Sequence, residues 1–380
     1  MLGYLLGRRD AFVSFLKSLT LRESPSGDPR SQVGVRDFLT RALDDLGYKP
    51  MQISGRGSGG HLYAAPRCRA SGSPVQLILG HYDTVWPIGT LETMPFEAHD
   101  NVVRGPGVYD MKGGITQAVF ALAALRDLEI DVPVAPLVFL NSDEEIGSRD
   151  SGRYIARLAK KMERVFVLEP SLGKSGKLKT TRKGVGRFHV KIKGRAAHAG
   201  LDPAAGASAI LELSHVIQDL FALNDADRGV TVNVGTVDGG LRPNVVAPMS
   251  EAVVDVRVLT RADAERIERA IHGLEPSTRG VSLEITGRIG RPPMEATDRN
   301  RALWTLARDL GRDIGLELGQ DTAGGGSDGN TTSLFAPTLD GLGAVGDGAH
   351  AHHEFLYIDK TIERAALLAL LLSAPPVKYR

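Results

Sequence analysis

Apolar runs and helix-like segments alternate along the first part of the chain. The runs are short and uninterrupted, as in buried strands, whereas the segments between them repeat apolar residues at helical spacing. This alternation predicts an α/β domain. We expect strands at 75–79, 136–140 and 164–168, and helices within 1–20 and at 33–46, 115–127, 151–161 and 301–312.

The pattern changes after Val185. Phe188, Val190 and Ile192 alternate with polar residues, which is typical of a strand with one buried face. The segments that follow predict the order β-α-β-β-α-β, the ferredoxin-like arrangement. We therefore expect an inserted α+β domain at 186–291 and a first domain made of 1–185 and 292–380.

Composition excludes several classes of protein. The 380 residues are 42% hydrophobic and 24% charged with a formal net charge of +1, which gives no electrostatic reason to expect a nucleic-acid or membrane partner. Residues 1–20 read as an amphipathic helix and not as a signal peptide, and the apolar tail at 365–374 is too short to span a bilayer. Cys68 is the only cysteine, which fits a reducing compartment, so we predict a cytoplasmic protein.

An acidic pair follows the second of the predicted strands. Glu144 and Glu145 come shortly after 136–140, where two adjacent carboxylates are costly unless a positive charge lies beside them. In extended chain their side chains point in opposite directions, which would suit a metal ligand next to a general base. A solvated acidic turn is the alternative for this stretch taken alone.

Further acids and histidines follow the other strands. His81 and Asp83 lie on one face of an extended chain, as in a local turn or in a metal-bound histidine with its supporting carboxylate. Asp110 precedes a helix and is either its cap or a ligand. His81, Asp110, Glu145 and Glu169 form a set of nitrogen and oxygen donors suited to zinc, manganese or cobalt.

Two later stretches leave their roles open. The histidines at 350, 352 and 353 form a metal-binding tract or a surface cluster. The glycine-rich loop at 322–330 lacks the Gly-Lys-Ser/Thr ending of a Walker phosphate loop.

These stretches together resemble the M20 family of dinuclear zinc peptidases and deacylases, and most closely its glutamate carboxypeptidase branch. The resemblance covers nearly the whole chain, and seven weak motifs in the family's order make it specific. The motifs are 80–85, 107–114, 142–148, 168–170, 194–200, 324–330 and His350 four residues before Glu354.

The resemblance implies a catalytic domain with a mixed sheet flanked by helices, and an inserted lid that carries the dimer contact. It implies two divalent ions, zinc with cobalt or manganese as alternatives, and a homodimer acting on a small peptide or N-acyl amino acid. The resemblance also implies the metal ligands: His81 and Glu169 bind one ion, Glu145 and His350 bind the other, and Asp110 bridges the two ions. It further implies that Asp83 orients His81 and that Glu144 is the general base. His198 would stabilise the oxyanion in the active site of a neighbouring subunit.

Substrate recognition is implied at three further positions. Arg291 lies in an Arg-Pro motif whose arginine holds the substrate's α-carboxylate, a task that suits guanidinium geometry. Lys177 lies where the branch places a cation for an acidic side chain, although a solvated lysine explains it equally well, and Asn244 adds a hydrogen bond to the substrate. We expect a carboxypeptidase that releases glutamate. The alternatives are an N-acyl-amino-acid deacylase of the acetylornithine or succinyl-diaminopimelate type, and a catalytically silent relative that only binds ligands.

Overall fold

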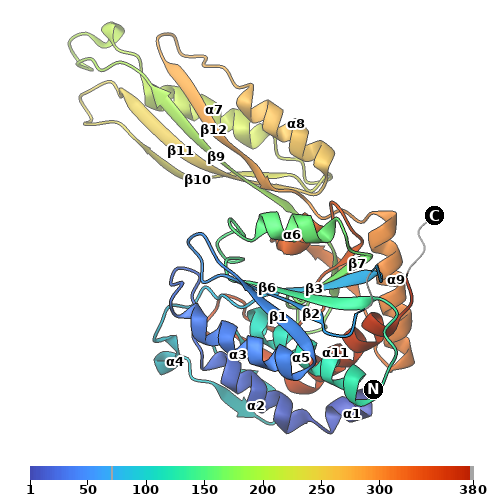
Figure 1. Ribbon diagram of the computed structural model, residues 1–380. Helices are drawn as coiled ribbons and strands as arrows, with labels where there is room; N and C mark the ends of the chain where they lie inside the picture. Colours follow the sequence, from blue (N-terminus) through green and yellow to red (C-terminus); the bar gives the residue numbers. More distant parts are fainter. Residues whose placement is uncertain (70–71, 377–380) are drawn as a thin grey trace. The chain divides into compact units, whose positions relative to one another are not determined.

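A computed structural model describes residues 1–69 and 72–376. Its contacts divide the chain into two compact units (Figure 1). The first unit comprises residues 1–180, 296–322 and 327–380, and the second comprises residues 181–295 and 323–326.

A six-stranded mixed sheet forms the centre of the first unit. Its strand order is β1-β2-β6-β3-β7-β14. The four strands from β6 to β14 run parallel, whereas β2 pairs antiparallel with both β1 and β6. The strands are β1 (Tyr48–Ile53), β2 (His61–Pro66), β3 (Val75–His81), β6 (Ala135–Asn141), β7 (Arg164–Val167) and β14 (Thr338–Leu339).

Helices cover both faces of this sheet because its central strands are apolar on both sides. Ile78, Val138 and Phe166 pack in a core with three helices, α3 (Gln32–Asp45), α5 (Gly113–Asp127) and α11 (Ile358–Ser373). Their neighbours Leu77 and Phe139 point the other way and pack with α6 (Gly152–Ala159). The remaining helices are α1 (Leu2–Leu6), α2 (Arg9–Thr20), α4 (Thr90–Thr93), α9 (Asp298–Asp313) and α10 (Asp328–Thr332).

Short strands form two smaller sheets. One has the order β15-β16-β5-β4, and in the other β8 (Leu178–Arg182) pairs with β13 (Gln320–Ala323). The glycine-rich loop leads into α10, where Ser327 forms a capping box with Asn330. The strands of the first of these sheets are β4 (Glu97–His99), β5 (Val102–Arg104), β15 (Gly346–Asp347) and β16 (Phe355–Tyr357).

The second unit has the element order β-α-β-β-α-β. Its antiparallel sheet has the order β10-β11-β9-β12, as in ferredoxin-like folds. Strand β9 alternates strictly between buried and exposed residues over most of its length, because only one face of the sheet is covered by helices. The elements are β9 (Gly184–Lys193), α7 (Ala209–Ala222), β10 (Thr231–Gly239), β11 (Met249–Val258), α8 (Arg261–His272) and β12 (Ser282–Arg291), with a 3₁₀ turn at Pro203–Ala205.

The predicted α/β class with a mixed sheet is confirmed, and several details differ. The first helix is broken into α1 and α2, and α11 begins at Ile358, well before the apolar tail. Strands β1 and β2 were not predicted, because β1 mixes polar and apolar residues and the apolar run of β2, residues 62–65, is short and includes two alanines. Within residues 1–69 and 72–376, no helix combines the length and the apolar character needed to cross a membrane.

Candidate metal centre

The carboxyl ends of β3, β6 and β7 define the site. These strands are adjacent and parallel, so the residues that follow them meet at one edge of the sheet. The chain continues from β3 to β6 on one side of it and then to β7 on the other, and ligands bind at such a reversal in α/β sheets. His81 ends β3, while Glu145 and Glu169 follow β6 and β7.

Asp110 reaches the same edge from an irregular turn before α5. The turn Val108–Lys112 has non-helical backbone angles at Asp110, so this aspartate is no ordinary helix cap. The helix that follows must approach closely, since a Cβ atom on Gly114 would lie 2.2 Å from the carbonyl oxygen of Leu168. Only glycine fits there, and it brings the start of α5 against the segment that carries Glu169.

The first ligand group consists of His81, Asp110 and Glu169. Nε2 of His81 lies 3.3 Å from Oδ1 of Asp110 and 3.6 Å from Oε1 of Glu169. Nδ1 of His81 lies 3.0 Å from the backbone carbonyl oxygen of Asp83 and therefore donates a proton to it. In the neutral imidazole this tautomer leaves the lone pair of Nε2, on the side of the two carboxylates, available to a metal ion.

The second ligand group consists of Asp110, Glu145 and His350. Nε2 of His350 lies 3.0 Å from Oε2 of Glu145 and 3.5 Å from Oδ2 of Asp110. His352 instead packs against Trp86 with its ring tilted, and the ring centroids lie 5.4 Å apart. His350 is therefore the histidine of this tract that the structure places with the acids. It has a left-handed backbone, φ 61°, which is uncommon outside glycine and is found at functional sites.

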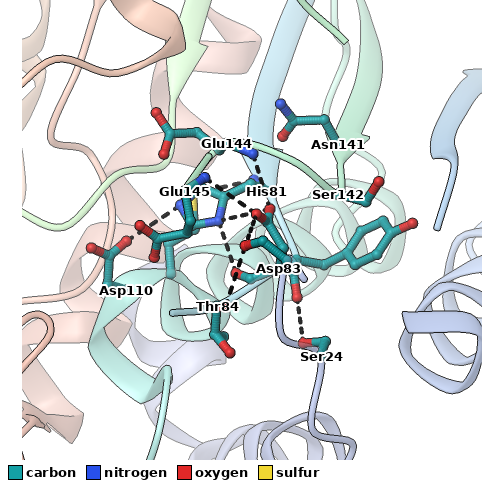
Figure 2. Close-up of polar contacts among 12 residues, drawn as sticks. Ser24, His81, Asp83, Thr84, Asp110, Asn141, Ser142, Glu144 and Glu145 are labelled. Carbon is teal, nitrogen blue, oxygen red and sulfur yellow. Dashed lines mark hydrogen bonds and ion pairs between the residues drawn. The ribbon is translucent and has the colours of Figure 1, made fainter. Parts of the chain in front are cut away.

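Asp83 organises the acidic pair behind His81. Its two carboxylate oxygens accept hydrogen bonds from the backbone N–H groups of Glu144 and Glu145, each at 3.2 Å, and Ser26 Oγ donates to it at 2.6 Å. The expectation that the glutamates lie in extended chain was wrong, because they lie in a turn closed by a hydrogen bond from Ser148 N to Asp143 O. Their side chains still diverge, and the carboxylate of Glu144 lies apart from His81 and Asp110 (Figure 2).

The residues present fit a pair of divalent cations. Among the described residues, Oε1 of Glu145 is a buried oxygen that has no hydrogen-bond partner, and the buried Oδ1 of Asp110 has only the contact with Nε2 of His81 at 3.3 Å. A buried carboxylate oxygen without a partner is costly, and a cation removes that cost. Imidazole nitrogens with carboxylate oxygens are the donors that zinc and its neighbours in the first transition row accept.

The pKa pattern supports the same conclusion. Burial raises the pKa of Glu145 to about 8, with a further contribution from the charge of Asp110. Hydrogen bonds to Asp110 and Glu145 raise the pKa of His350 to about 10. Burial lowers the pKa of His81, but its hydrogen bonds to Asp110 and Asp83 outweigh burial and raise it well above the usual value. The carboxylates of Glu145 and Asp110 are therefore stabilised by a nearby positive charge, which a metal ion supplies directly.

Two residues beside the ligands were not predicted from the sequence. In the sequence motif, Glu354 served only to define the position of His350, four residues before it. In the structure Glu354 is buried and accepts hydrogen bonds from the backbone N–H groups of Tyr109 and Asp110. Nζ of the buried Lys179 lies 4.0 Å from Oε2 of Glu169. The sequence motifs favoured Lys177 instead, whose Nζ forms an exposed ion pair with Asp321 at 2.9 Å. Strand alternation could not separate these lysines, because they lie two residues apart.

The other predicted substrate residues belong to the second unit. His198 and Asn244 are exposed, and Arg291 is half-buried at the end of β12. Nδ1 of His198 accepts hydrogen bonds from the backbone N–H groups of Gly200 and Leu201, each at 3.1 Å. In a neutral imidazole this fixes the proton on Nε2, which makes that atom a hydrogen-bond donor.

Comparison with known proteins identifies the family. The sequence signature of peptidase family M20/M25/M40 matches residues 77–374, most of the chain. The chain belongs to this family. Among relatives of this M20 peptidase is carboxypeptidase G2 of Pseudomonas sp. (strain RS-16), which is 25% identical over 367 residues, 95% of this chain and 88% of that protein. The succinyl-diaminopimelate desuccinylase of Azoarcus sp. (strain BH72) is 24% identical over 342 residues, 86% of this chain and 88% of that protein.

Solved structures show the same fold. The aminopeptidase PepT of Bacillus cereus ATCC 10987 aligns with a TM-score of 0.81 at 20% identity, covering 96% of this chain and 98% of that one. The YXEP protein of Bacillus subtilis aligns with a TM-score of 0.71 at 14% identity, covering 97% and 98%. This M20 peptidase is therefore a hydrolase of the carboxypeptidase or aminoacylase kind. The expectation of a catalytically silent relative does not hold.

Proposed function

We propose that this M20 peptidase is a dinuclear metallocarboxypeptidase that releases a C-terminal glutamate from a peptidyl or N-acyl conjugate. The observation that carries the proposal is the pair of ligand groups that share Asp110. Glu144 directly precedes the ligand Glu145 in a turn whose backbone N–H groups are held by Asp83. The YXEP protein is described as a dinuclear metal-binding peptidase, and carboxypeptidase G2 is the relative that covers 95% of this chain.

His81 and Glu169 would hold one ion, Glu145 and His350 the other, and Asp110 both. Zinc fits these donors, and cobalt or manganese would fit as well. When bound, two such ions supply Lewis-acid activation of water and of the scissile carbonyl at neutral pH.

Glu144 would carry the proton. Its backbone is held by Asp83, while its side chain is 9% exposed and lies apart from the ligands. The carboxylate accepts a proton as water adds to the amide carbon, and it returns that proton to the leaving nitrogen as the C–N bond breaks. The products are a carboxylate and a free amino acid.

His198, Arg291, Asn244 and Lys177 would recognise the substrate. His198 presents an Nε2–H donor suited to an oxyanion, and it would act in the neighbouring subunit of a homodimer. Arg291 would bind the α-carboxylate, Asn244 would add a hydrogen bond, and Lys177 would attract the acidic side chain of glutamate.

Turnover of a small substrate panel tests the proposal. The zinc-loaded protein should hydrolyse N-acyl-glutamate and peptidyl-glutamate faster than N-acyl-ornithine, and free acids faster than their C-terminal amides. A metal-free sample serves as the control. Equal cleavage of free acids and amides would contradict the carboxypeptidase assignment.

A deacylase of the acetylornithine or succinyl-diaminopimelate type is the second candidate. The similarity to the Azoarcus desuccinylase over 86% of this chain favours it. Preferential hydrolysis of N-acetylornithine or N-succinyl-diaminopimelate in the same panel would select it.

A further inference from the structure

The two ligand groups are held in place by different means. In the first, His81 and Glu169 come from the ends of the adjacent strands β3 and β7, and their side chains are 2% and 10% exposed. In the second, Glu145 comes from a turn and His350 from the loop between β15 and β16. The His350 side chain is 53% exposed. His81 is paired in the sheet with Asn141, and the backbone N–H of Leu168, next to Glu169, donates to Leu79 O of β3 at 2.9 Å. Sheet hydrogen bonds thus support the first group at or next to its ligands, whereas the loop of His350 needs another support.

Glu354 supports the second group through hydrogen bonds to the backbone around Asp110. It is 1% exposed, and its carboxylate accepts four hydrogen bonds. Oε1 accepts from the backbone N–H groups of Tyr109 at 2.9 Å and Asp110 at 3.0 Å. Oε2 accepts from the backbone N–H of Gly107 at 2.9 Å and from Nε1 of Trp86 at 2.8 Å. Both oxygens are engaged by N–H donors, so Glu354 acts on the backbone of Asp110 and is no further ligand.

Glu354 lies in the same loop as the ligand His350, so it links that loop to the backbone of Asp110. It lies four residues after His350, and its own backbone N–H donates to Ala351 O at 2.9 Å, which closes the turn directly after His350. The turn that contains His350 is closed by a hydrogen bond from Ala351 N to Gly348 O, also at 2.9 Å, so the two turns share Ala351. One buried side chain therefore ties the backbone of the shared ligand Asp110 to the loop of the second group. Residues that orient ligands in this way commonly change metal affinity by about 10- to 100-fold when substituted.

We propose that Glu354 is a positioning residue for the second metal position, formed by Asp110, Glu145 and His350, and that this position depends on Glu354 more than the first does. The inference rests on the proposed dinuclear function. Asp110 belongs to both groups, but the first retains His81 within β3 and Glu169 directly after Leu168, which is hydrogen-bonded to β3. The two positions should therefore respond unequally when Glu354 is changed.

Stepwise titration of the metal-free protein with Co²⁺, followed by its absorbance and by competition with a chelator, tests this inference. Glu354→Gln keeps the shape but removes the charge, and it directs an NH₂ group at N–H donors. We expect one binding step to weaken by about 10- to 100-fold and the other to change by less than about threefold. The weakened step should be the one lost in His350→Ala and retained in His81→Ala.

A matched control separates positioning from general stability. Glu212, in the second unit, is also 1% exposed and caps the backbone N–H groups of Ser277 at 3.0 Å and Thr278 at 2.7 Å. Glu212→Gln should lower the melting temperature but leave both Co²⁺ steps unchanged. If Glu354→Gln does not fold, Glu354→Asp keeps the charge, withdraws it from the N–H groups and should weaken the same step.

The outcomes separate the inference from the function it rests on. A wild-type protein that binds fewer than two Co²⁺ ions contradicts the dinuclear function itself. Two ions in the wild type, with equal weakening of both steps or no weakening in a folded Glu354 variant, overturn only the role of Glu354. The same loss of Co²⁺ affinity in Glu212→Gln overturns it too.

Discussion

The sheets of the two units place polar residues in opposite ways. In the first unit β3 is buried along nearly its whole length, and polar groups begin where the strand ends. In the second unit β9 and β11 present alternate residues to solvent along most of their length. The first arrangement gathers charged groups at one desolvated edge, where electrostatic interactions are strong, and the second leaves them solvated. We therefore expect metal binding and proton transfer to depend on buried residues of the first unit, and the exposed residues of the second unit to contribute hydrogen bonds to the oxyanion and to the substrate.

The largest effect should come from the first unit. Glu144→Gln should lower kcat by about 10²- to 10⁴-fold, because an amide cannot shuttle the proton. Fold and metal content should stay at wild-type levels, as checked by circular dichroism and metal analysis. A near-normal kcat would remove Glu144 from the role of base.

A smaller but still large effect is expected from His198 in the second unit. His198→Ala should lower kcat by about 10²- to 10³-fold, as removal of an oxyanion donor does elsewhere. Mixing inactive His198→Ala with inactive Glu144→Gln should restore activity through hybrid dimers once subunit exchange has been verified by labelled chains. Verified exchange without recovery would contradict action in the neighbouring subunit.

Arg291 should affect recognition more than rate. Arg291→Ala should lower kcat/KM on a free-acid substrate by about 10- to 100-fold, because a charge-assisted hydrogen bond is worth about 1.5–3 kcal/mol. The same variant should lose little on the C-terminal amide, which lacks the carboxylate. Arg288→Ala, an exposed arginine on the same strand, is the control and should leave both substrates unchanged. Equal losses on acid and amide would rule out direct contact with the carboxylate.

The smallest effect is expected at Lys177, which is 44% exposed and belongs to the first unit. Exposed ion pairs contribute about 0–1 kcal/mol, so Lys177→Ala should lower kcat/KM for C-terminal glutamate by roughly fivefold or less. Substrates that end in alanine should not change. Asp321→Asn frees the ammonium from its partner and should improve the glutamate substrate, if Lys177 contacts it. An equal loss on both substrates would exclude this contact.

The alternation of apolar runs and helices was sufficient to predict the α/β class and the central strands β3, β6 and β7. These strands are buried on both faces, so their sequences are continuously apolar and stand out. Strand β1 lies at the edge of the sheet and β2 is only partly buried, so neither carries that signal. Sequence motifs likewise selected Lys177, while the structure puts Lys179 near Glu169.

The sequence by itself determined which residues can bind metal and move protons, because residue type and position after a strand are local properties. These properties marked His81, Asp110, Glu145 and Glu169 as candidate ligands, and the family resemblance selected His350 from its tract. Only the tertiary structure shows that Asp110 faces both histidines, and it places His350, which the resemblance had selected, with the acids and His352 against Trp86. It alone revealed that Glu354 binds the backbone N–H of a residue 244 positions away. Such contacts depend on how distant segments pack, and no local pattern encodes them.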